Sequence, residues 1–298
     1  MTNLELEKTA NEIRKSIVTA VHSAKSGHPG GSLSSADIFT YLYFEEMNID
    51  PKNPKMEDRD RFVLSKGHVA PGLYSTLAER GYFPKEDLVT LRHTGSYLQG
   101  HPDMKHIPGV DMSSGSLGQG LSVAVGMAAV GKYDKKDYRV YTLCGDGEIQ
   151  EGQIWEAAMW AGFKKLDNLV VVVDNNNLQI DGAVDEVCSP YPIDKKFEAF
   201  NFHTININGN DFDEIRDWAA FHHERLDGTG YPFGKTAAEL NTHERMMACI
   251  DIYQALTESR PYKKGMPHEK ACEILWDMAK KGWLDEAIVK QVEDCFRG

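Results

Sequence analysis

Two polar motifs, each standing directly after a run of apolar residues, decide the fold class of this chain. The motif Gly-Asp-Gly at 145–147 follows the apolar run at 138–143, and the motif Asp-Asn-Asn-Asn at 174–177 follows the Val-rich run at 169–173. Between them we expect a helix at 150–163. A strand–helix–strand unit whose strands are continuous apolar runs is typical of a parallel sheet covered on both faces. We therefore expect an α/β fold with a parallel sheet flanked by helices.

The earlier and later parts of the first two-thirds of the chain agree with this fold class. Residues 4–21 place apolar side chains near the 3.6-residue period of a helix, and the Gly- and Pro-rich stretch at 27–31 is expected to end it. Ser35 is expected to cap the next helix. Further elements are expected as follows: helices at 36–47, at 118–130 and from 212 onward, and strands at 61–65 and 204–207.

The pattern changes beyond residue 219, where no strand pattern continues. Helices are expected at 241–257, 268–281 and 285–296. The change occurs close to Asp217 and without the polar or flexible segment that usually joins two domains. We expect two domains: 1–217, which lacks its last strand, and 218–298, which is small and all-helical.

The composition of the chain excludes several kinds of partner. The formal net charge is −12, from 33 Lys and Arg against 45 Asp and Glu, whereas nucleic-acid binding needs clustered positive charge. The longest apolar run, 169–173, is far shorter than the roughly 20 residues that cross a membrane. The acidic N-terminus does not resemble a signal peptide, and the five cysteines form no CxxC pair. We therefore expect a cytoplasmic protein with no membrane and no nucleic acid as partner.

The two motifs together predict a diphosphate site held by a metal ion. Asp146 would lie at the carboxyl end of its strand, where open α/β sheets bind ligands, and the flanking glycines let the backbone approach an anion. Asn176 and the carbonyl oxygen of Leu178 would come from the neighbouring strand end. One carboxylate, one amide oxygen and one carbonyl oxygen, completed by two diphosphate oxygens and a water, form a shell suited to Mg²⁺. Both motifs could instead be turns, but their position after two strands of one unit disfavours that alternative.

At these residues the chain resembles a known family. The segment GDGEIQEGQIWEAAMWAGFKKLDNLVVVVDNNNLQIDG resembles the thiamine-diphosphate motif of transketolases. Four further segments match the diphosphate-binding domain of that family: KSGHPGGSLSSADI, DRFVLSKGHVAPGLY, GHPDMKHIPGVDMSSGSLGQGLSVAVGMA and NFHTININGNDFDEI. The resemblance covers about residues 2–217. It implies the thiamine-diphosphate-binding fold, with thiamine diphosphate and Mg²⁺ (or Ca²⁺ or Mn²⁺) as cofactors, and transfer of a two-carbon ketol unit between sugar phosphates.

The resemblance also implies roles for individual residues. The implied metal ligands are Asp146, Asn176 and the carbonyl of Leu178. The implied cofactor-binding residues are Gly115, Asp146, Gly147, Glu151 and Asn176. Catalytic roles are implied for three histidines that each stand beside a glycine, namely His28, His68 and His101. Histidine suits proton transfer to hydroxyl and carbonyl groups near neutral pH.

The transketolase pattern is incomplete in this chain. The family's pyrimidine-binding domain, which supplies the glutamate that activates the cofactor, does not follow residue 217. The last strand of the first domain and its glycine-rich loop are also replaced. Some transketolases are split into two chains, so the resemblance implies a pyrimidine-binding partner subunit within a homo- or hetero-oligomer.

A second dense motif, HHERLDGTGYP at 222–232, resembles the signature of the HD-GYP phosphodiesterases, which hydrolyse cyclic di-GMP. This resemblance covers about 219–298. It implies metal ligands at His222, His223 and Asp251, and phosphate contacts at Arg260 and Lys263. The HD pair and the upstream helix with its own ligands are missing, and three ligands cannot hold two metal ions with a bridging hydroxide. We predict an incomplete site without phosphodiesterase activity.

Both resemblances break off at the same place, which favours a chimeric chain. The first interpretation of function is an enzyme component of the transketolase type. The second is a cofactor-binding or scaffold protein without catalysis. A cyclic di-GMP phosphodiesterase is the least favoured of the three.

Overall fold

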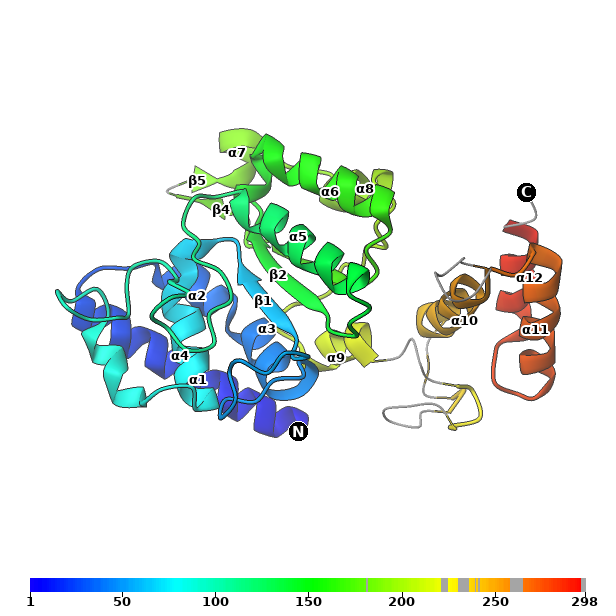
Figure 1. Cartoon of the computed structure of the whole chain (residues 1–298), viewed down its shortest axis with the longest axis horizontal. Coiled ribbons are helices and arrows are strands. Elements are labelled where there is room, and N and C mark those ends of the chain that lie inside the picture. The colour runs from blue at the N-terminus through cyan, green and yellow to red at the C-terminus, as the bar shows by residue number, and fades with distance from the viewer. Residues whose placement is uncertain are drawn as a thin grey trace. The chain divides into compact units, whose positions relative to one another are not determined.

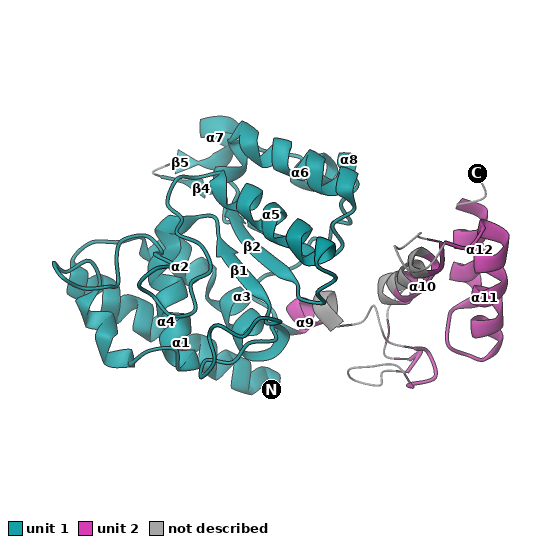
Figure 2. Ribbon diagram, in the orientation of Figure 1, with its two compact units in different colours: residues 1–212 teal, residues 213–298 magenta. Residues whose placement is uncertain are grey.

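A short parallel sheet forms the centre of the first part of the chain in the computed structural model (Figure 1). The described residues are 1–180, 182–220, 225–229, 236–238, 240, 242–257 and 265–295. They divide into two units, Met1–Phe212 and Asp213–Gly298, which Figure 2 colours separately. Each unit is described by itself.

In the described part of the first unit, three parallel strands lie in the order β1-β2-β3. Their bounds are Arg61–Leu64 for β1, Val140–Gly145 for β2 and Leu169–Asp174 for β3. The last pair in the register joins Gly145 to Asp174. The two polar motifs of the sequence therefore leave the sheet side by side, at the same carboxyl edge.

Helices cover both faces of this sheet, as the continuous apolar strands predict. On one face, Val63 packs in a cluster with side chains of α5 (Gln119–Tyr133) and α6 (Gly152–Lys164). On the other face, the ring of Phe62 lies 5.7 Å from that of Phe39 in α3 (Ala36–Tyr41). The expected α/β class, with helices flanking a parallel sheet, is confirmed.

The remaining elements of the first unit surround this core. The α-helices are α1 (Asn3–Ala24), α2 (Pro29–Ser34), α4 (Ala70–Arg80), α7 (Val184–Cys188) and α8 (Ile193–Ala199), while α9 (Phe212–Ala220) crosses the unit boundary. Shorter helical turns are η1 (Leu42–Glu46), η2 (Gly67–Val69), η3 (Lys85–Thr90) and η4 (Glu148–Gln150). The antiparallel pair β4 (Leu178–Gln179) and β5 (Gly182–Ala183) follows β3.

Three helices form the described core of the second unit. They are α10 (Thr242–Thr257), α11 (His268–Lys280) and α12 (Glu286–Cys295), close to the bounds expected from the sequence. Their buried side chains include Cys249, Leu275 and Val289. This confirms a small helical C-terminal segment.

One local expectation is wrong. Residues 204–207 form no strand: the stretch is irregular and Ile205 is 43% exposed, because β-branched residues favour extended backbone but do not by themselves supply a pairing partner. Ser35 is the N-cap residue of α3, as expected, although its side chain makes no capping hydrogen bond. The first helix ends before the stretch at 27–31, also as expected, and α2 begins within that stretch at Pro29, a residue tolerated in the first helical turn.

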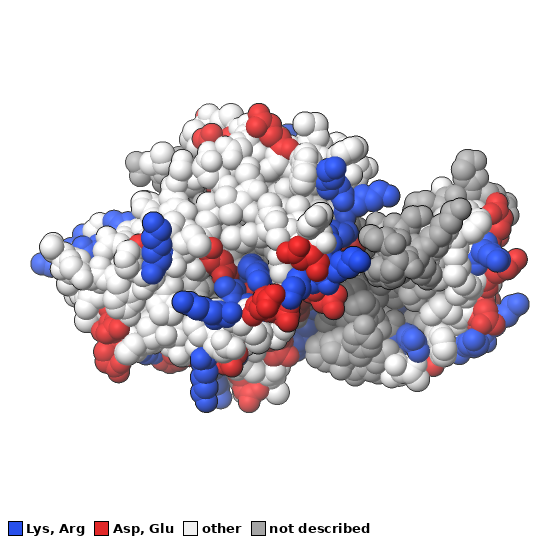
Figure 3. All heavy atoms as spheres, viewed as in Figure 1, with Lys and Arg blue, Asp and Glu red and all other residues white. Residues whose placement is uncertain are grey.

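The charges on the described surface are of both signs. On the face of the first unit shown in Figure 3, Lys and Arg are interspersed with Asp and Glu in a central band. Among the described helices, none is both long and apolar enough to cross a membrane.

Candidate functional site

Asp146 lies at the carboxyl edge of the sheet, where it is buried and its carboxylate accepts two backbone hydrogen bonds. Its side chain is 2% exposed. One carboxylate oxygen accepts a hydrogen bond from the backbone N–H of Gly147 (2.9 Å), and the other accepts one from the backbone N–H of Asn177 (2.7 Å). Burial raises the pKa of this carboxyl, although both hydrogen bonds oppose the shift. The bond to Asn177 ties the end of β2 directly to the loop after β3.

Asn176 and Leu178 belong to that loop. The side-chain oxygen of Asn176 accepts a hydrogen bond from the backbone N–H of Leu178 (3.0 Å). An amide oxygen has a second lone pair, and each Asp146 oxygen also retains one beyond its backbone bond. Carboxylate, amide and carbonyl oxygens are the ligands that Mg²⁺ prefers, so this donor set fits the expected metal.

The expected site differs from a cluster of ionisable ligands. Among the residues that the structure describes, no group of three or more His, Cys, Asp or Glu side chains could hold a metal ion. The donor set at the sheet edge contains only one such side chain, Asp146. Its remaining ligands would have to come from neutral oxygens and from the diphosphate itself.

A tyrosine from a later segment contacts the same loop. The Tyr191 hydroxyl lies 2.6 Å from the side-chain oxygen of Asn175 and also contacts that of Asn177. A hydroxyl has one proton to donate, so one of these two amides must present its nitrogen instead. Tyr191 therefore holds the residues on both sides of Asn176.

Several glycines at this edge occupy positions where a side chain would crowd a neighbouring residue. A Cβ atom on Gly147 would lie 3.1 Å from the side chain of Gln179. Gly115 has φ +155°, and a Cβ there would lie 3.1 Å from the ring of His101. A Cβ on Gly67 would lie 2.7 Å from the backbone nitrogen of Gly115, so these two loops meet through bare main chain.

The three expected histidines lie near one another. The rings of His28 and His68 are 5.1 Å apart, edge to face. Burial, helped by Lys66 and by the other two histidines, lowers the pKa of His68 to about 4, so His68 is neutral at physiological pH. Burial also lowers the pKa of His101. A neutral imidazole can both donate and accept a proton.

Glu148 is the carboxylate that sequence reasoning missed. It is 3% exposed and accepts hydrogen bonds from the Ser65 hydroxyl (2.6 Å) and from the backbone N–H groups of Gly118 (2.8 Å) and Gly145 (3.0 Å). It thereby joins the ends of β1 and β2 to the start of α5. The expected residue Glu151, by contrast, is exposed at the start of α6 and makes no side-chain cap there.

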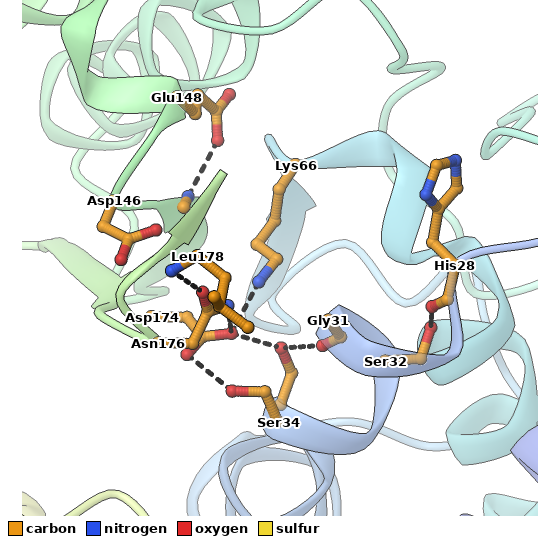
Figure 4. A network of polar contacts seen from close by, with 12 residues as sticks. His28, Gly31, Ser32, Ser34, Lys66, Asp146, Glu148, Asp174, Asn176 and Leu178 are labelled. Carbon is orange, nitrogen blue, oxygen red and sulfur yellow. Dashed lines mark hydrogen bonds and ion pairs between the residues drawn. The ribbon is translucent and has the colours of Figure 1, made fainter. Parts of the chain in front are cut away.

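Lys66 and Asp174 were missed as well. Figure 4 shows the Lys66 side chain extending to Asp174, whose carboxylate also accepts hydrogen bonds from Ser34 (2.8 Å) and Ser35 (3.2 Å). Placing every residue after a strand at the carboxyl edge would have found Lys66, because it stands two positions beyond β1.

The second predicted metal site is not described. His222 and His223 lie outside the described residues. Asp251 belongs to α10, but its side chain is also outside the described part. The remnant site stays a prediction.

An open parallel sheet with oxygen donors and bare glycines at its carboxyl edge is typical of α/β domains that bind ligands at that edge. The family described as "Transketolase, thiamine diphosphate binding domain" matches residues 6–227, and the family described as "HD domain" matches 195–288. The two matches overlap at 195–227.

Relatives and solved structures agree with the first match. The chain is 48% identical over 212 residues to the "6-deoxy-6-sulfo-D-fructose transketolase subunit SqwG" of Clostridium sp. (strain MSTE9), covering 71% of this chain and 77% of that protein. It is 46% identical over 212 residues to an apulose-4-phosphate transketolase subunit of Phocaeicola vulgatus (71% and 74%). The solved transketolase of Leishmania mexicana is 36% identical, with a TM-score of 0.69 over 72% of this chain and 34% of that one.

The chain belongs to the transketolase family, whose named members are transferases. It spans about three-quarters of the subunit-type relatives and about a third of the solved transketolase.

Proposed function

We propose that this chain binds thiamine diphosphate with Mg²⁺ and acts as one component of a transketolase-type enzyme. The observation that carries the proposal is the meeting of Asp146 and the 176–178 loop at paired strand ends, joined by the hydrogen bond from Asn177 to Asp146 (2.7 Å). In this proposal Asp146, Asn176 and the carbonyl of Leu178 hold the metal.

The remaining residues of the edge bind and orient. Gly147 and the loop at Gly115 let the main chain approach the diphosphate, because neither carries a side chain there. Glu148 holds Gly118 and Gly145 in place. Glu151 is exposed at the start of α6, with its Cβ beside Gly118, and is proposed to contact the cofactor from there.

The histidines are proposed to handle protons of the sugar substrate. Thiamine diphosphate, when bound, supplies the nucleophilic carbon and stores the electrons of the two-carbon ketol unit. His68, neutral because of its burial, can accept a hydrogen bond from a substrate hydroxyl, and His28 and His101 stand beside it to hold further oxygens. Sugar phosphates are the proposed substrates.

A partner chain is part of the proposal. Two of the relatives are named as transketolase subunits, and the chain spans about a third of a solved single-chain transketolase. We propose that a pyrimidine-binding subunit completes the site in a homo- or hetero-oligomer. A cytoplasmic location stays a prediction.

The C-terminal unit is proposed to derive from an HD-GYP domain that lacks its first half, joined near residue 217 to make a chimera. The match of the HD domain family to 195–288 supports its relation to HD proteins. The predicted absence of cyclic di-GMP hydrolysis is checked by incubating the purified chain with cyclic di-GMP and Mn²⁺. Hydrolysis would contradict it.

The central experiment is calorimetric titration of the purified chain with thiamine diphosphate at saturating Mg²⁺. We expect binding by the wild type and its loss in Asp146→Ala. Asp137→Ala, which removes an exposed carboxylate elsewhere, serves as the matched control and is expected to bind normally. No binding by the wild type, or equal binding by Asp146→Ala, would refute the proposal.

A further inference from the structure

Three carboxylates and one buried lysine stand at the carboxyl edge of the sheet, and the lysine pairs with one of them, Asp174. Asp146, Glu148 and Asp174 all stand at or just beyond the ends of β2 and β3. Lys66 is 1% exposed, and its ammonium lies 2.6 Å from an oxygen of Asp174. An anion could not approach three uncompensated carboxylates.

We propose that Lys66 is the positioning residue that makes this edge accept an anion, and that Asp174 is its fixed counter-ion rather than a metal ligand. The inference rests on the proposed function in that the anion is the diphosphate of the cofactor. In this inference Lys66 attracts the anion, whereas Asp174 balances the charge of Lys66 without binding a ligand.

Asp174 accepts four hydrogen bonds from its own partners. One oxygen accepts from the Ser34 hydroxyl (2.8 Å), and the other accepts from Lys66 (2.6 Å), from Ser35 (3.2 Å) and from the side-chain amide of Asn176 (3.4 Å). The second oxygen is fully occupied by its donors, the first keeps one lone pair, and the charge of the carboxylate is balanced by Lys66. The same contacts tie the end of α2 to the metal-binding loop, as Figure 4 shows.

The Lys66 ammonium has protons beyond the one that it donates to Asp174. It is buried, and among the described residues its side chain makes one hydrogen bond, the one to Asp174. A Cβ on Gly31 would lie 3.8 Å from the Lys66 nitrogen and 3.8 Å from the Nε2 atom of His68, so both nitrogens face the bare main chain of α2. An ammonium has three protons to donate, so Lys66 can keep its bond to Asp174 while it contacts a phosphate oxygen.

The test uses two probes of opposite charge: Mn²⁺ alone, followed by electron paramagnetic resonance, and inorganic pyrophosphate at saturating Mg²⁺, followed by calorimetry. In Lys66→Met, the freed charge of Asp174 should tighten Mn²⁺ binding by roughly tenfold and weaken pyrophosphate binding by roughly tenfold or more. In Asp174→Asn the two shifts should reverse in sign. Lys52→Met, which removes an exposed lysine, is the matched control.

A double variant, Lys66→Met with Asp174→Asn, guards against misfolding, because removing both members of a buried ion pair is tolerated better than removing one. It should bind Mn²⁺ within about threefold of the wild type and still bind pyrophosphate roughly tenfold more weakly. Losses of both probes in both single variants, or unchanged pyrophosphate binding in the double variant, would overturn the inference. A wild type that binds Mn²⁺ and pyrophosphate but does not bind thiamine diphosphate would refute the proposed function and leave the role of Lys66 standing.

Discussion

Glu148 offers the sharpest test of how the sheet edge is held together. Its Oε1 atom accepts from the Ser65 hydroxyl and the Gly118 N–H, and its Oε2 atom accepts from the Gly145 N–H. In Glu148→Gln one of these positions becomes an NH₂ group, which cannot accept. The best arrangement keeps the amide oxygen on Ser65 and Gly118 and leaves the buried N–H of Gly145 without an acceptor.

One buried donor without an acceptor costs about 1–3 kcal/mol of unfolding free energy. Glu148→Ala leaves all three donors without their acceptor, so we expect a loss of about 3 kcal/mol or more. With a denaturant slope of about 2–3 kcal/mol per molar urea, the midpoint should fall by about 0.5–1 M in the Gln variant and further in the Ala variant.

The assay is urea unfolding combined with hydrogen exchange of the peptides that contain Gly118 and Gly145. Exchange should rise at Gly145 in Glu148→Gln and at both glycines in Glu148→Ala. Glu86→Gln, an exposed carboxylate, should change neither quantity. A Gln variant with the wild-type midpoint and wild-type exchange at Gly145 would refute the reasoning.

Three further predictions concern the loop, a histidine and a glycine. Tyr191→Phe removes the hydroxyl that holds Asn175 and Asn177, so Mn²⁺ should bind several-fold more weakly by paramagnetic resonance while the urea midpoint stays within about 0.3 M of the wild type. The folded pKa of His68, about 4, lies below its ordinary 6.5, so the folded chain binds fewer protons between these values. Stability should therefore fall as the pH is lowered from 6.5 toward 4, and less steeply in His68→Gln, as urea midpoints across that range will show. A Cβ on Gly162 would overlap the carbonyl oxygen of Phe200, so Gly162→Ala should lose about 2–3 kcal/mol in urea unfolding, whereas Gly126→Ala, with open space around it, should lose nothing.

The residues predicted from the sequence share one property. Asp146 and Asn176 follow strands that are recognisable as apolar runs, and the rule that ligands bind at the carboxyl edge places them without any knowledge of distant contacts. The pairing of Gly145 with Asp174 then brings the two motifs together. The ligand set itself stays a prediction.

The residues that were missed depend on contacts between distant parts of the chain. Lys66 reaches Asp174 across 108 positions, and Glu148 reaches Ser65 across 83. The position of Lys66 after β1 would have placed it at the carboxyl edge, but its contact with Asp174 and that of Glu148 with Ser65 carry no local signal, because an isolated lysine or glutamate after a strand is ordinarily a solvated surface residue. The wrong strand at 204–207 has the same cause, since strand formation needs a partner that local preference does not supply.

The sheet edge also shows how an acidic chain would accommodate the anion proposed here. The side chains at the carboxyl ends of the three strands differ in charge. Lys66 and His68 follow β1, Asp146 follows β2, and Asp174 is the last residue of β3. The net charge of −12 is therefore no guide to this site, because the buried cation, the metal proposed for Asp146 and the bare glycine backbone act within a few ångströms. Charges spread over the surface are screened by salt at about 8–10 Å, whereas a buried pair such as Lys66 and Asp174 is screened much less. Salt should accordingly alter the affinity for pyrophosphate far less than the substitution of Lys66 does, because the attraction is local and buried.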